Sequence, residues 1–301
     1  MITITQKKAD LLIALIAAAW GSSYIFMKMG LGTIGVFNLA ALRFGLAFLL
    51  TAPFFYKRLF HTDKKTLLYG AILGFTLICV LAMLMFGLKV TSASSAGFLA
   101  GTTVVFVPLL QTAIRRKRPN AKIISSVILI MSGIALLTID RSFKIEFQSL
   151  LCVLAALIYA VQIILTSYFS LKADPLTLGV LQLGIAGLCG LIASFIFETP
   201  TLPQTQMEWI AVLALSIVCS AFGFVLQPLA QKHTTPERTG VLFSLEPVFS
   251  AIFGFAFLGE MLKVHGYAGA LLVFGGVILS GLSNKVFSIK VWNWSLKKHR
   301  G

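Results

Sequence analysis

The stretch KVTSASSAGFL, residues Lys89–Leu99, returns as KHTTPERTGVL at Lys232–Leu242, 143 residues later and without a gap. At four positions the two copies have the same residue: Lys89 and Lys232, Thr91 and Thr234, Gly97 and Gly240, and Leu99 and Leu242. The match continues at the same offset, with Gly133 falling on Gly276, and both copies lie in strongly apolar sequence. Many transporters are membrane chains made of two related halves, so the repeat favours that architecture.

The composition places the chain in lipid. Hydrophobic residues make up 58% of it, only 12% are charged, and the mean hydropathy is +0.93. Soluble domains carry about 25% charged residues, whereas a spanning helix needs ~20 mostly apolar residues. We therefore predict an all-α integral membrane protein. Its ten predicted spans are Leu11–Met27, Met29–Tyr56, Leu67–Leu88, Thr91–Ile114, Ile123–Ile139, Phe147–Leu171, Pro175–Phe197, Trp209–Gln231, Thr239–Gly259 and Val264–Asn284.

Five spans in each half is an odd number, so the second half must enter the membrane from the opposite face. The early spans also align, at an offset of 139, with Trp20 on Tyr159 and Arg43 on Gln182; the offset then changes because Glu198–Met207 lengthens the second half. Two inverted five-helix repeats around a central cavity suit alternating access. The predicted units are a first repeat over residues 9–140, a second over residues 147–284 and a basic cytoplasmic tail over residues 285–301.

Positive charge is divided unequally between the two faces of the membrane. If the N-terminus is cytoplasmic, nineteen of the 25 Lys and Arg residues fall on that side, five on the other, and Arg43 within a span. Cytoplasmic loops carry such an excess, so we predict cytoplasmic termini and a multi-pass protein of the inner, or plasma, membrane. The net charge of +15 then reflects orientation and contact with the lipid bilayer, which argues against a nucleic-acid partner. The tail, with Trp292 and Trp294 among lysines, is either interfacial or disordered.

Two charged side chains lie inside predicted spans. An ionised group at mid-bilayer costs roughly 2.5–3.5 kcal/mol, so Arg43 should face the bundle interior. It either attracts an anionic group such as a carboxylate or is a structural Arg bonded to backbone carbonyls.

Glu246 precedes Pro247, and a proline disturbs the helical turn before it. Glu246 either serves proton coupling or amino-group binding, or it stabilises the kink in its neutral form. With a depth difference of about 10 Å, Arg43 and Glu246 could contact opposite ends of one zwitterionic solute.

Other polar and aromatic residues in the spans have two interpretations each. Trp20 and Tyr159 favour cavity lining, whereas Gly21, Ser22 and Ser23 favour helix packing. Each glutamine amide needs a partner in lipid, so it either bonds neighbouring helices or faces the solute. The predicted substrate-binding residues are Trp20, Ser23, Tyr24, Arg43, Thr103, Tyr159, Gln162, Gln182, Gln227 and Glu246, with Glu246 also as the coupling residue.

No sequence signature of catalysis is present. The four histidines have no metal-ligand spacing, and HExxH, GxSxG, Walker and dinucleotide-binding patterns are absent. The four cysteines all fall inside predicted spans, where they are typical of small buried hydrophobes. We therefore expect a protein that is not an enzyme, that needs no metal or cofactor, and whose transport is secondary.

Five short motifs stand out along the chain: Trp20–Ser23, Arg43-Phe44, Leu245–Val248, Phe257–Glu260 and Gly275–Val277. Together they resemble the EamA family of the drug/metabolite transporter (DMT) superfamily, over about residues 9–284. The resemblance implies an inner-membrane carrier, often an exporter of amino acids or other metabolites, with ten helices around a central cavity. The first half departs from the pattern, because Arg116-Lys117 stands where the second half has Gly259-Glu260.

The expected function is secondary transport of a small organic solute, an amino acid or related metabolite, with export favoured and alternating access as the mechanism. The first, second, fourth, sixth, eighth and ninth spans should line the cavity. One alternative is a carrier of nucleotide sugars or phosphorylated metabolites, which should need several inward-facing basic residues. Another is a lipid scramblase, which should need a polar groove open to lipid.

Overall fold

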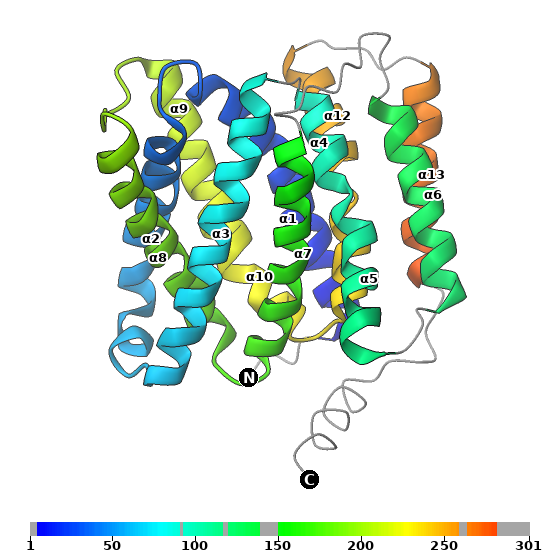
Figure 1. Ribbon diagram of the computed structural model, residues 1–301, viewed down its shortest axis with the longest axis horizontal. Helices are drawn as coiled ribbons and strands as arrows, with labels where there is room; N and C mark the ends of the chain where they lie inside the picture. Colours follow the sequence, from blue (N-terminus) through cyan, green and yellow to red (C-terminus); the bar gives the residue numbers. More distant parts are fainter. Residues whose placement is uncertain (1–4, 91–92, 117–119, 139–149, 259–263, 282–301) are drawn as a thin grey trace.

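The computed structural model describes residues 5–90, 93–116, 120–138, 150–258 and 264–281, and within them every regular element is a helix (Figure 1). The predicted tail and the Gly259-Glu260 signature lie outside the described residues. The helices are α1 (Gln6–Gly30), α2 (Val36–Phe60), α3 (Lys64–Val90), α4 (Ala93–Gly101), α5 (Thr103–Arg115), α6 (Ala121–Thr138), α7 (Leu150–Ser170), α8 (Pro175–Phe197), α9 (Gln206–Ala214), the π-helix η2 (Leu215–Phe222), α10 (Gly223–Gln231), α11 (Pro236–Phe243), α12 (Glu246–Leu258) and α13 (Val264–Gly281).

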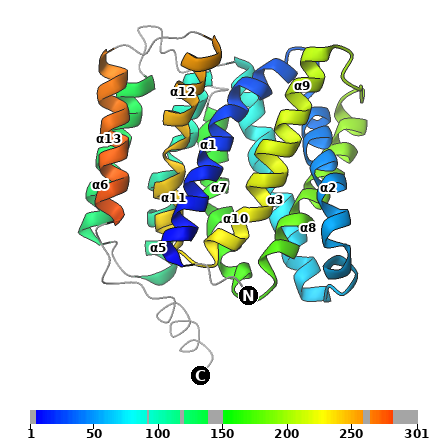
Figure 2. The same ribbon diagram turned by 180° about the vertical axis from the view of Figure 1, so that it is seen from behind.

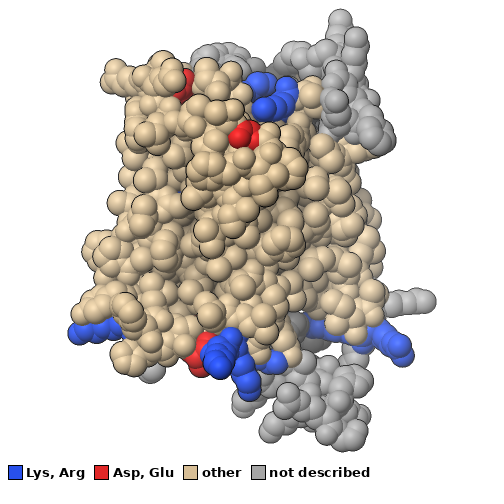
Figure 3. Space-filling model, turned by 60° about the vertical axis from the view of Figure 1, so that its left-hand side comes forward, with Lys and Arg blue, Asp and Glu red and all other residues tan. Residues whose placement is uncertain are grey.

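These helices confirm the predicted all-α membrane architecture. Seven helical segments are long and apolar enough to cross a membrane, and three shorter apolar helices, Leu99–Arg115, Ala121–Leu136 and Val264–Ser280, bring the number to the ten predicted. On the face shown in Figure 3, Lys, Arg, Asp and Glu gather at the two ends of the bundle and leave an uncharged band between them. We call the end at which α1 and α3 finish the upper end, and the end at which they begin the lower end (Figure 1).

The sequence repeat is reproduced in the bounds of the helices. Those of α13 are the bounds of α6 advanced by 143 residues. The fourth and ninth spans are both broken, the fourth at Thr102 and the ninth at Ser244 and Leu245, so that α5 begins at Thr103 and α12 at the equivalent residue, Glu246. Broken helices near the middle of a membrane expose backbone groups and are typical of transporter binding sites.

Each half packs mainly against the other. The most extensive contacts join α2 to α8 and α6 to α13, which are equivalent helices of the two halves. Helix α1 packs against α10, α11 and α12, and α7 packs against α3, α4 and α5, which is the same arrangement with the halves exchanged (Figure 2). Glycines permit this closeness: a Cβ on Gly187 would lie 2.7 Å from the Gly45 nitrogen, and one on Gly133 would lie 2.6 Å from the Gly269 oxygen.

The equivalent helices α2 and α8 begin with different caps. Asp174 caps α8 within its own half, accepting hydrogen bonds from the Thr177 nitrogen at 2.9 Å and hydroxyl at 2.7 Å, and it meets Arg58 at 3.0 Å. Partial burial works to raise the pKa of Asp174, but these hydrogen bonds and the Arg58 charge outweigh it, so the pKa lies below its ordinary range. Helix α2 begins after Gly35, and Glu198 of the other half caps it by accepting from the Asn38 nitrogen at 2.9 Å.

Candidate functional site

A cavity lies where the broken helices of the two halves meet. Its empty space is about 690 Å³ when the open solvent at its mouth is included. Helices α1, α2, α4, α5, α7, α10, α11 and α12 contribute to its wall, as the sequence indicated; α3 contributes Val80, Leu81 and Leu84, which the sequence did not indicate. Seven of the ten predicted site residues line it: Trp20, Ser23, Tyr24, Arg43, Thr103, Tyr159 and Glu246.

Arg43 is the cation of the cavity wall and is only 1% exposed. Its Nε donates to the Ser220 hydroxyl at 2.7 Å, and its Nη1 points at the Met27 sulfur, a weak acceptor, at 3.6 Å. The guanidinium carbon also lies 5.4 Å from the ring centre of Phe44 and 5.9 Å from that of Phe224. These contacts involve Nε and Nη1, and a guanidinium has five N–H donors in all, so Arg43 in the cavity lining can bind an anionic group.

Glu246 is the first residue of α12 and lies beside the break in the ninth span. The hydroxyl of Tyr24 is its hydrogen-bonding partner, and the charge of Arg43 acts on it from another part of the same wall. Among the described residues the two charges form no ion pair within 4.0 Å. A cation and a carboxyl on one wall, not neutralised by direct contact, can receive the two ends of a zwitterion.

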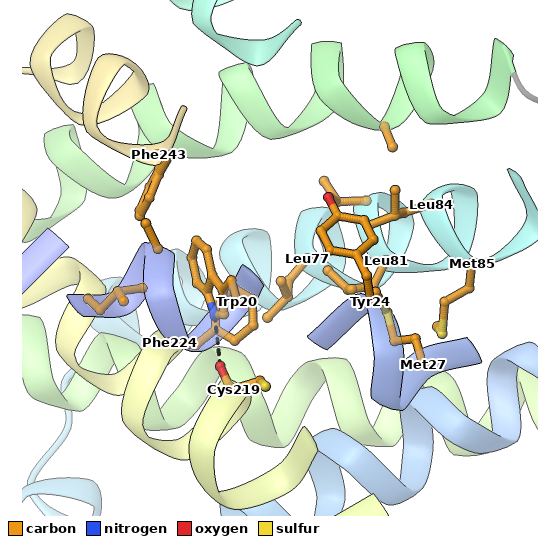
Figure 4. Packing of buried hydrophobic residues seen from close by; sticks show 14 of the residues in the cluster. Trp20, Tyr24, Met27, Leu77, Leu81, Leu84, Met85, Cys219, Phe224 and Phe243 are labelled. Carbon is orange, nitrogen blue, oxygen red and sulfur yellow. Dashed lines mark hydrogen bonds between the residues drawn. The ribbon is translucent and has the colours of Figure 1, made fainter. Parts of the chain in front are cut away.

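Four aromatic side chains close the cavity toward the lower end, and we call them the aromatic floor: Trp20, Tyr159, Phe224 and Phe243. The Trp20 ring centre lies 4.7 Å from that of Phe224, 4.8 Å from that of Phe243 and 6.0 Å from that of Tyr159. Figure 4 shows Trp20 between Phe224 and Phe243, with Tyr24 farther along α1. Aromatic rings at these distances pack favourably against one another, so the four side chains support each other's positions.

The π-helix η2 holds the floor in place. Trp20 donates from Nε1 to the Cys219 carbonyl oxygen at 2.8 Å (Figure 4), and Arg43 donates to Ser220, so two side chains of the first half bond to this segment. A π-helix does not make the usual i→i−4 hydrogen bonds, which leaves carbonyls available to side chains. A Cβ on Gly223 would lie 2.4 Å from the Trp20 nitrogen, so glycine is needed there for the indole to approach.

Below the floor, charged residues tie the halves together at the lower end. Arg238 of α11 contacts Asp10 of α1 at 2.6 Å, and Thr234 donates to the same carboxylate at 3.3 Å. Arg115 of α5 and Glu237 of α11 form a second pair at 3.6 Å. We call the Asp10–Arg238 and Arg115–Glu237 pairs the lower latch. The latch therefore joins the two halves at the lower end.

The three predicted glutamines do not line the cavity. Gln162, Gln182 and Gln227 are fully buried. Gln162 donates to the Gln182 side-chain oxygen at 3.4 Å, and Gln182 donates to the Phe224 carbonyl at 2.8 Å. Gln227 donates to the Tyr159 hydroxyl at 3.3 Å. In this conformation they therefore bond neighbouring helices, which is one of the two interpretations that the sequence allowed.

The sequence did not single out Phe224, Phe243 or the Arg43–Ser220 hydrogen bond as parts of the site. With 25 phenylalanines in the chain, one that faces a cavity carries no signal to distinguish it from one that faces lipid. In the described part of the chain, no group of three or more His, Cys, Asp or Glu residues stands close enough together to hold a metal ion.

Known proteins share both the sequence and the fold. The sequence matches the model of the EamA-like transporter family twice, over residues 7–139 and 147–282. The chain belongs to the EamA-like transporter family.

Two Archaeoglobus fulgidus proteins, each named only as an uncharacterized transporter, resemble this EamA-like protein along most of its length. One is 32% identical over 91% of this chain and 98% of its own, and the other is 30% identical over 93% and 87%. A solved crystal structure superposes with a TM-score of 0.78 over 92% of this chain and 97% of its own, at 18% identity, which supports the fold alone. Transport is therefore the general function of this multi-pass membrane protein, and its relatives are named as transporters rather than enzymes.

Proposed function

We propose that this EamA-like protein is a secondary transporter that moves an amino acid or related small metabolite across the inner, or plasma, membrane by alternating access. One observation carries the proposal: Arg43 and Glu246, with Tyr24 beside it, line one cavity between the two halves, and among the described residues the two charged side chains form no ion pair. The Arg43 guanidinium suits a carboxylate, and the Glu246 carboxyl suits an amino group. The aromatic floor offers an apolar surface to the remainder of the solute.

The remaining lining residues have supporting roles in this proposal. Ser23 and Thr103 supply hydroxyl groups beside the two charged positions, and Trp20 and Tyr159 bound the site from below. Thr103 already donates to backbone carbonyls, to Ala100 at 2.8 Å and Ala156 at 3.2 Å, so its hydroxyl keeps mainly acceptor capacity for a solute. We assign no cofactor or metal to the cycle.

The lower end is the cytoplasmic end in this proposal, because the excess of Lys and Arg in the sequence falls in the loops at that end. The conformation is then open toward the outside and closed toward the cytoplasm by the floor and the latch. The resemblance to EamA carriers favours export as the direction of net transport.

A carrier of phosphorylated metabolites or nucleotide sugars is the less favoured function. Phosphate esters carry more negative charge than a carboxylate, and their sites combine several cationic or backbone N–H donors. Among the described residues that line the cavity, Arg43 is the one Lys or Arg, and Glu246 lines the same cavity. That balance of charge favours a zwitterion over a dianion.

The test is solute flux from proteoliposomes loaded with a mixed pool of amino acids and small metabolites, with and without a pH gradient, against protein-free liposomes. Selective release of zwitterionic solutes is the expected result. Release of phosphate esters in preference to amino acids would reverse the substrate assignment. No release of any solute from folded, inserted protein would count against the proposal.

Coupling is tested in the same vesicles with Glu246→Gln, which keeps the shape of the side chain but removes its titratable group. If Glu246 carries the coupled proton, flux through this variant should no longer respond to the pH gradient, although exchange of solute for solute should continue. A variant whose flux keeps the wild-type response to pH would remove Glu246 from the coupling role and leave only a solute-binding one.

A further inference from the structure

The residues above and below the aromatic floor are related by the repeat. Along α1, Ser23 lies one turn above Trp20, and along α7, Gln162 lies one turn below Tyr159 at the equivalent position, 139 residues later. Ser23 lines the cavity, whereas Gln162 is fully buried. The cavity therefore reaches the residue on one side of the floor and does not reach its counterpart on the other side.

Two further pairs of positions behave in the same way. Leu84 of α3 lines the cavity, and its equivalent 143 residues later is Gln227 of α10, which is fully buried. Arg43 lines the cavity eight residues into α2, and its equivalent Gln182 is fully buried eight residues into α8. In all three pairs the residue of the first half faces the cavity and the residue of the second half does not.

The buried glutamines are not fully satisfied where they are. The side-chain oxygens of Gln162 and Gln227 have no hydrogen-bond partner among the described residues, although both are shielded from the membrane and from the cavity. A buried amide oxygen without a donor raises the free energy of the conformation that contains it. A conformation that hydrates these oxygens or gives them a solute donor would relieve that cost.

We propose that Gln162, Gln182 and Gln227 form the solute-contacting wall of a second conformation, in which the cavity opens toward the lower end. The inference rests on the proposed alternating access: if the halves exchange conformations, each of these glutamines takes the place in the cavity lining that its counterpart has here. The central residues Trp20, Tyr159, Thr103 and Glu246 then serve both conformations, while the wall around them changes.

The ligand chemistry of the two walls differs. The upper wall presents a guanidinium to an anionic group, whereas the lower wall presents three neutral amides, each able to donate to a carboxylate and accept from an ammonium group. A zwitterionic solute keeps partners for both of its ends in both conformations. Its carboxylate loses the charge-assisted contact to Arg43 on moving to the lower wall, which eases its release at that end.

Accessibility of an introduced thiol tests the inference without knowledge of the substrate. The four native cysteines are replaced by alanine, and Gln227→Cys is placed in that background, purified in detergent and treated with a water-soluble maleimide. Asp10→Asn is then added to break the lower latch, since its partner Arg238 is 2.6 Å away. Labelling of Q227C should rise by roughly fivefold, the factor expected for weakening one partly buried ion pair.

Two controls separate the possible outcomes. Thr234→Cys, beside the latch, reports opening of the lower end itself, and Ile130→Cys, buried in α6, reports general loosening of the fold. If T234C labelling rises with Asp10→Asn while Q227C labelling does not, the lower end opens without exposing the glutamines and the inference is wrong, although alternating access stands. If neither rises, alternating access itself is contradicted and the inference falls with it.

Equal rises of labelling in Q227C and I130C would mean that the fold has loosened, which also overturns the inference. Where Gln227→Cys does not give folded protein, Gln162→Cys on α7 replaces it. The inference predicts the same rise for Q162C, because both residues occupy the lower wall and lie one turn below the floor.

Discussion

The two halves of the bundle share a backbone plan but present different chemistry to the cavity. Arg43 in the first half corresponds to Gln182 in the second, and Thr103 corresponds to Glu246, so each half contributes one charge where the other has a neutral polar group. In the proposed mechanism, the backbone symmetry allows two related conformations, and the side-chain asymmetry distinguishes the two ends of the site. A solute with unlike ends can therefore be oriented inside a nearly symmetric frame.

The third helix of each half shows the same contrast. In the first half α3 is a continuous α-helix, whereas its equivalent in the second half contains the π-helix η2. Trp20 and Arg43, both of the first half, donate to Cys219 and Ser220 within it. The π-helix thus lies where two side chains of the first half find hydrogen-bond acceptors. Variants that remove these contacts one at a time test the difference between the halves.

The largest effect is expected for Arg43→Gln, which gives the first half the residue that the second half already has. Loss of a charge-assisted hydrogen bond should weaken binding of carboxylate solutes by about 1.5–3 kcal/mol, or roughly 10- to 100-fold. Amide analogues of the same solutes should lose much less. Competition of both kinds of compound against a labelled solute in proteoliposomes measures the difference.

Ser220→Ala is the matched control for that prediction. It removes the partner of the Arg43 Nε but keeps the cation in the cavity. It should therefore lower affinity for carboxylates less than Arg43→Gln does. Equal losses for carboxylates and amides in Arg43→Gln would indicate a structural Arg that does not contact solute.

Trp20→Phe should destabilise the fold by about 2 kcal/mol, because it removes the donor to the Cys219 carbonyl and leaves a gap in the aromatic floor. Chemical denaturation of the purified protein in mixed micelles measures the change. Gly223→Ala provides an independent check, since its added methyl group displaces the same indole. Unchanged stability in both variants would show that the π-helix does not depend on this hydrogen bond.

A smaller loss is expected for Tyr159→Phe, the equivalent change in the second half. It removes one hydroxyl that accepts from Gln227, with little change in volume, and should cost about 0.5–1.5 kcal/mol. The same denaturation assay compares it directly with Trp20→Phe. If Tyr159→Phe were the more destabilising of the two, the floor would depend on the second half instead of the first.

The sequence predicts part of this site for a clear physical reason. Lipid penalises a misplaced charge, and each span requires ~20 apolar residues, so charges and long apolar windows can be recognised in the sequence. The ten spans and the interior positions of Arg43 and Glu246 are predicted in this way. Pro247 indicates the break in the ninth span. At the equivalent break in the fourth span, Thr102 is not a residue that predicts a break. Nothing in Leu215–Phe222 distinguishes a π-helix from an α-helix, and the burial of the glutamines depends on which conformation is formed.

The smallest effect concerns the caps of α2 and α8. Because Asp174 caps its own helix and is partly exposed, Asp174→Ala should cost about 0.5–1 kcal/mol at pH 7. The pKa of Asp174 is depressed in the fold, so its contribution is present above the ordinary pKa of about 3.9 and is lost as the pH falls through the lower, folded value. Denaturation at pH 7 and near pH 3 should show the difference from wild type shrinking on acidification.

Asp174→Asn separates the cap from the ion pair with Arg58, because asparagine caps helices as well as aspartate does. It should retain most of the stability at pH 7 and show little of the dependence on acid. A loss as large as that of Asp174→Ala would assign the effect to the Arg58 contact. The cap that Glu198 makes on α2 joins the two halves, so Glu198→Ala should cost more than Asp174→Ala.

The bond between Arg43 and Ser220 spans 177 residues of chain. At a synthesis rate of about 5–20 residues per second, Arg43 leaves the ribosome roughly 10–35 s before its partner does. For most of that interval α8, the main neighbour of α2, has also not been made, and Arg43 is a cation that the bilayer penalises. The final environment of Arg43 is therefore completed late in synthesis, and a chain truncated before the eighth span would leave this cation without its acceptor.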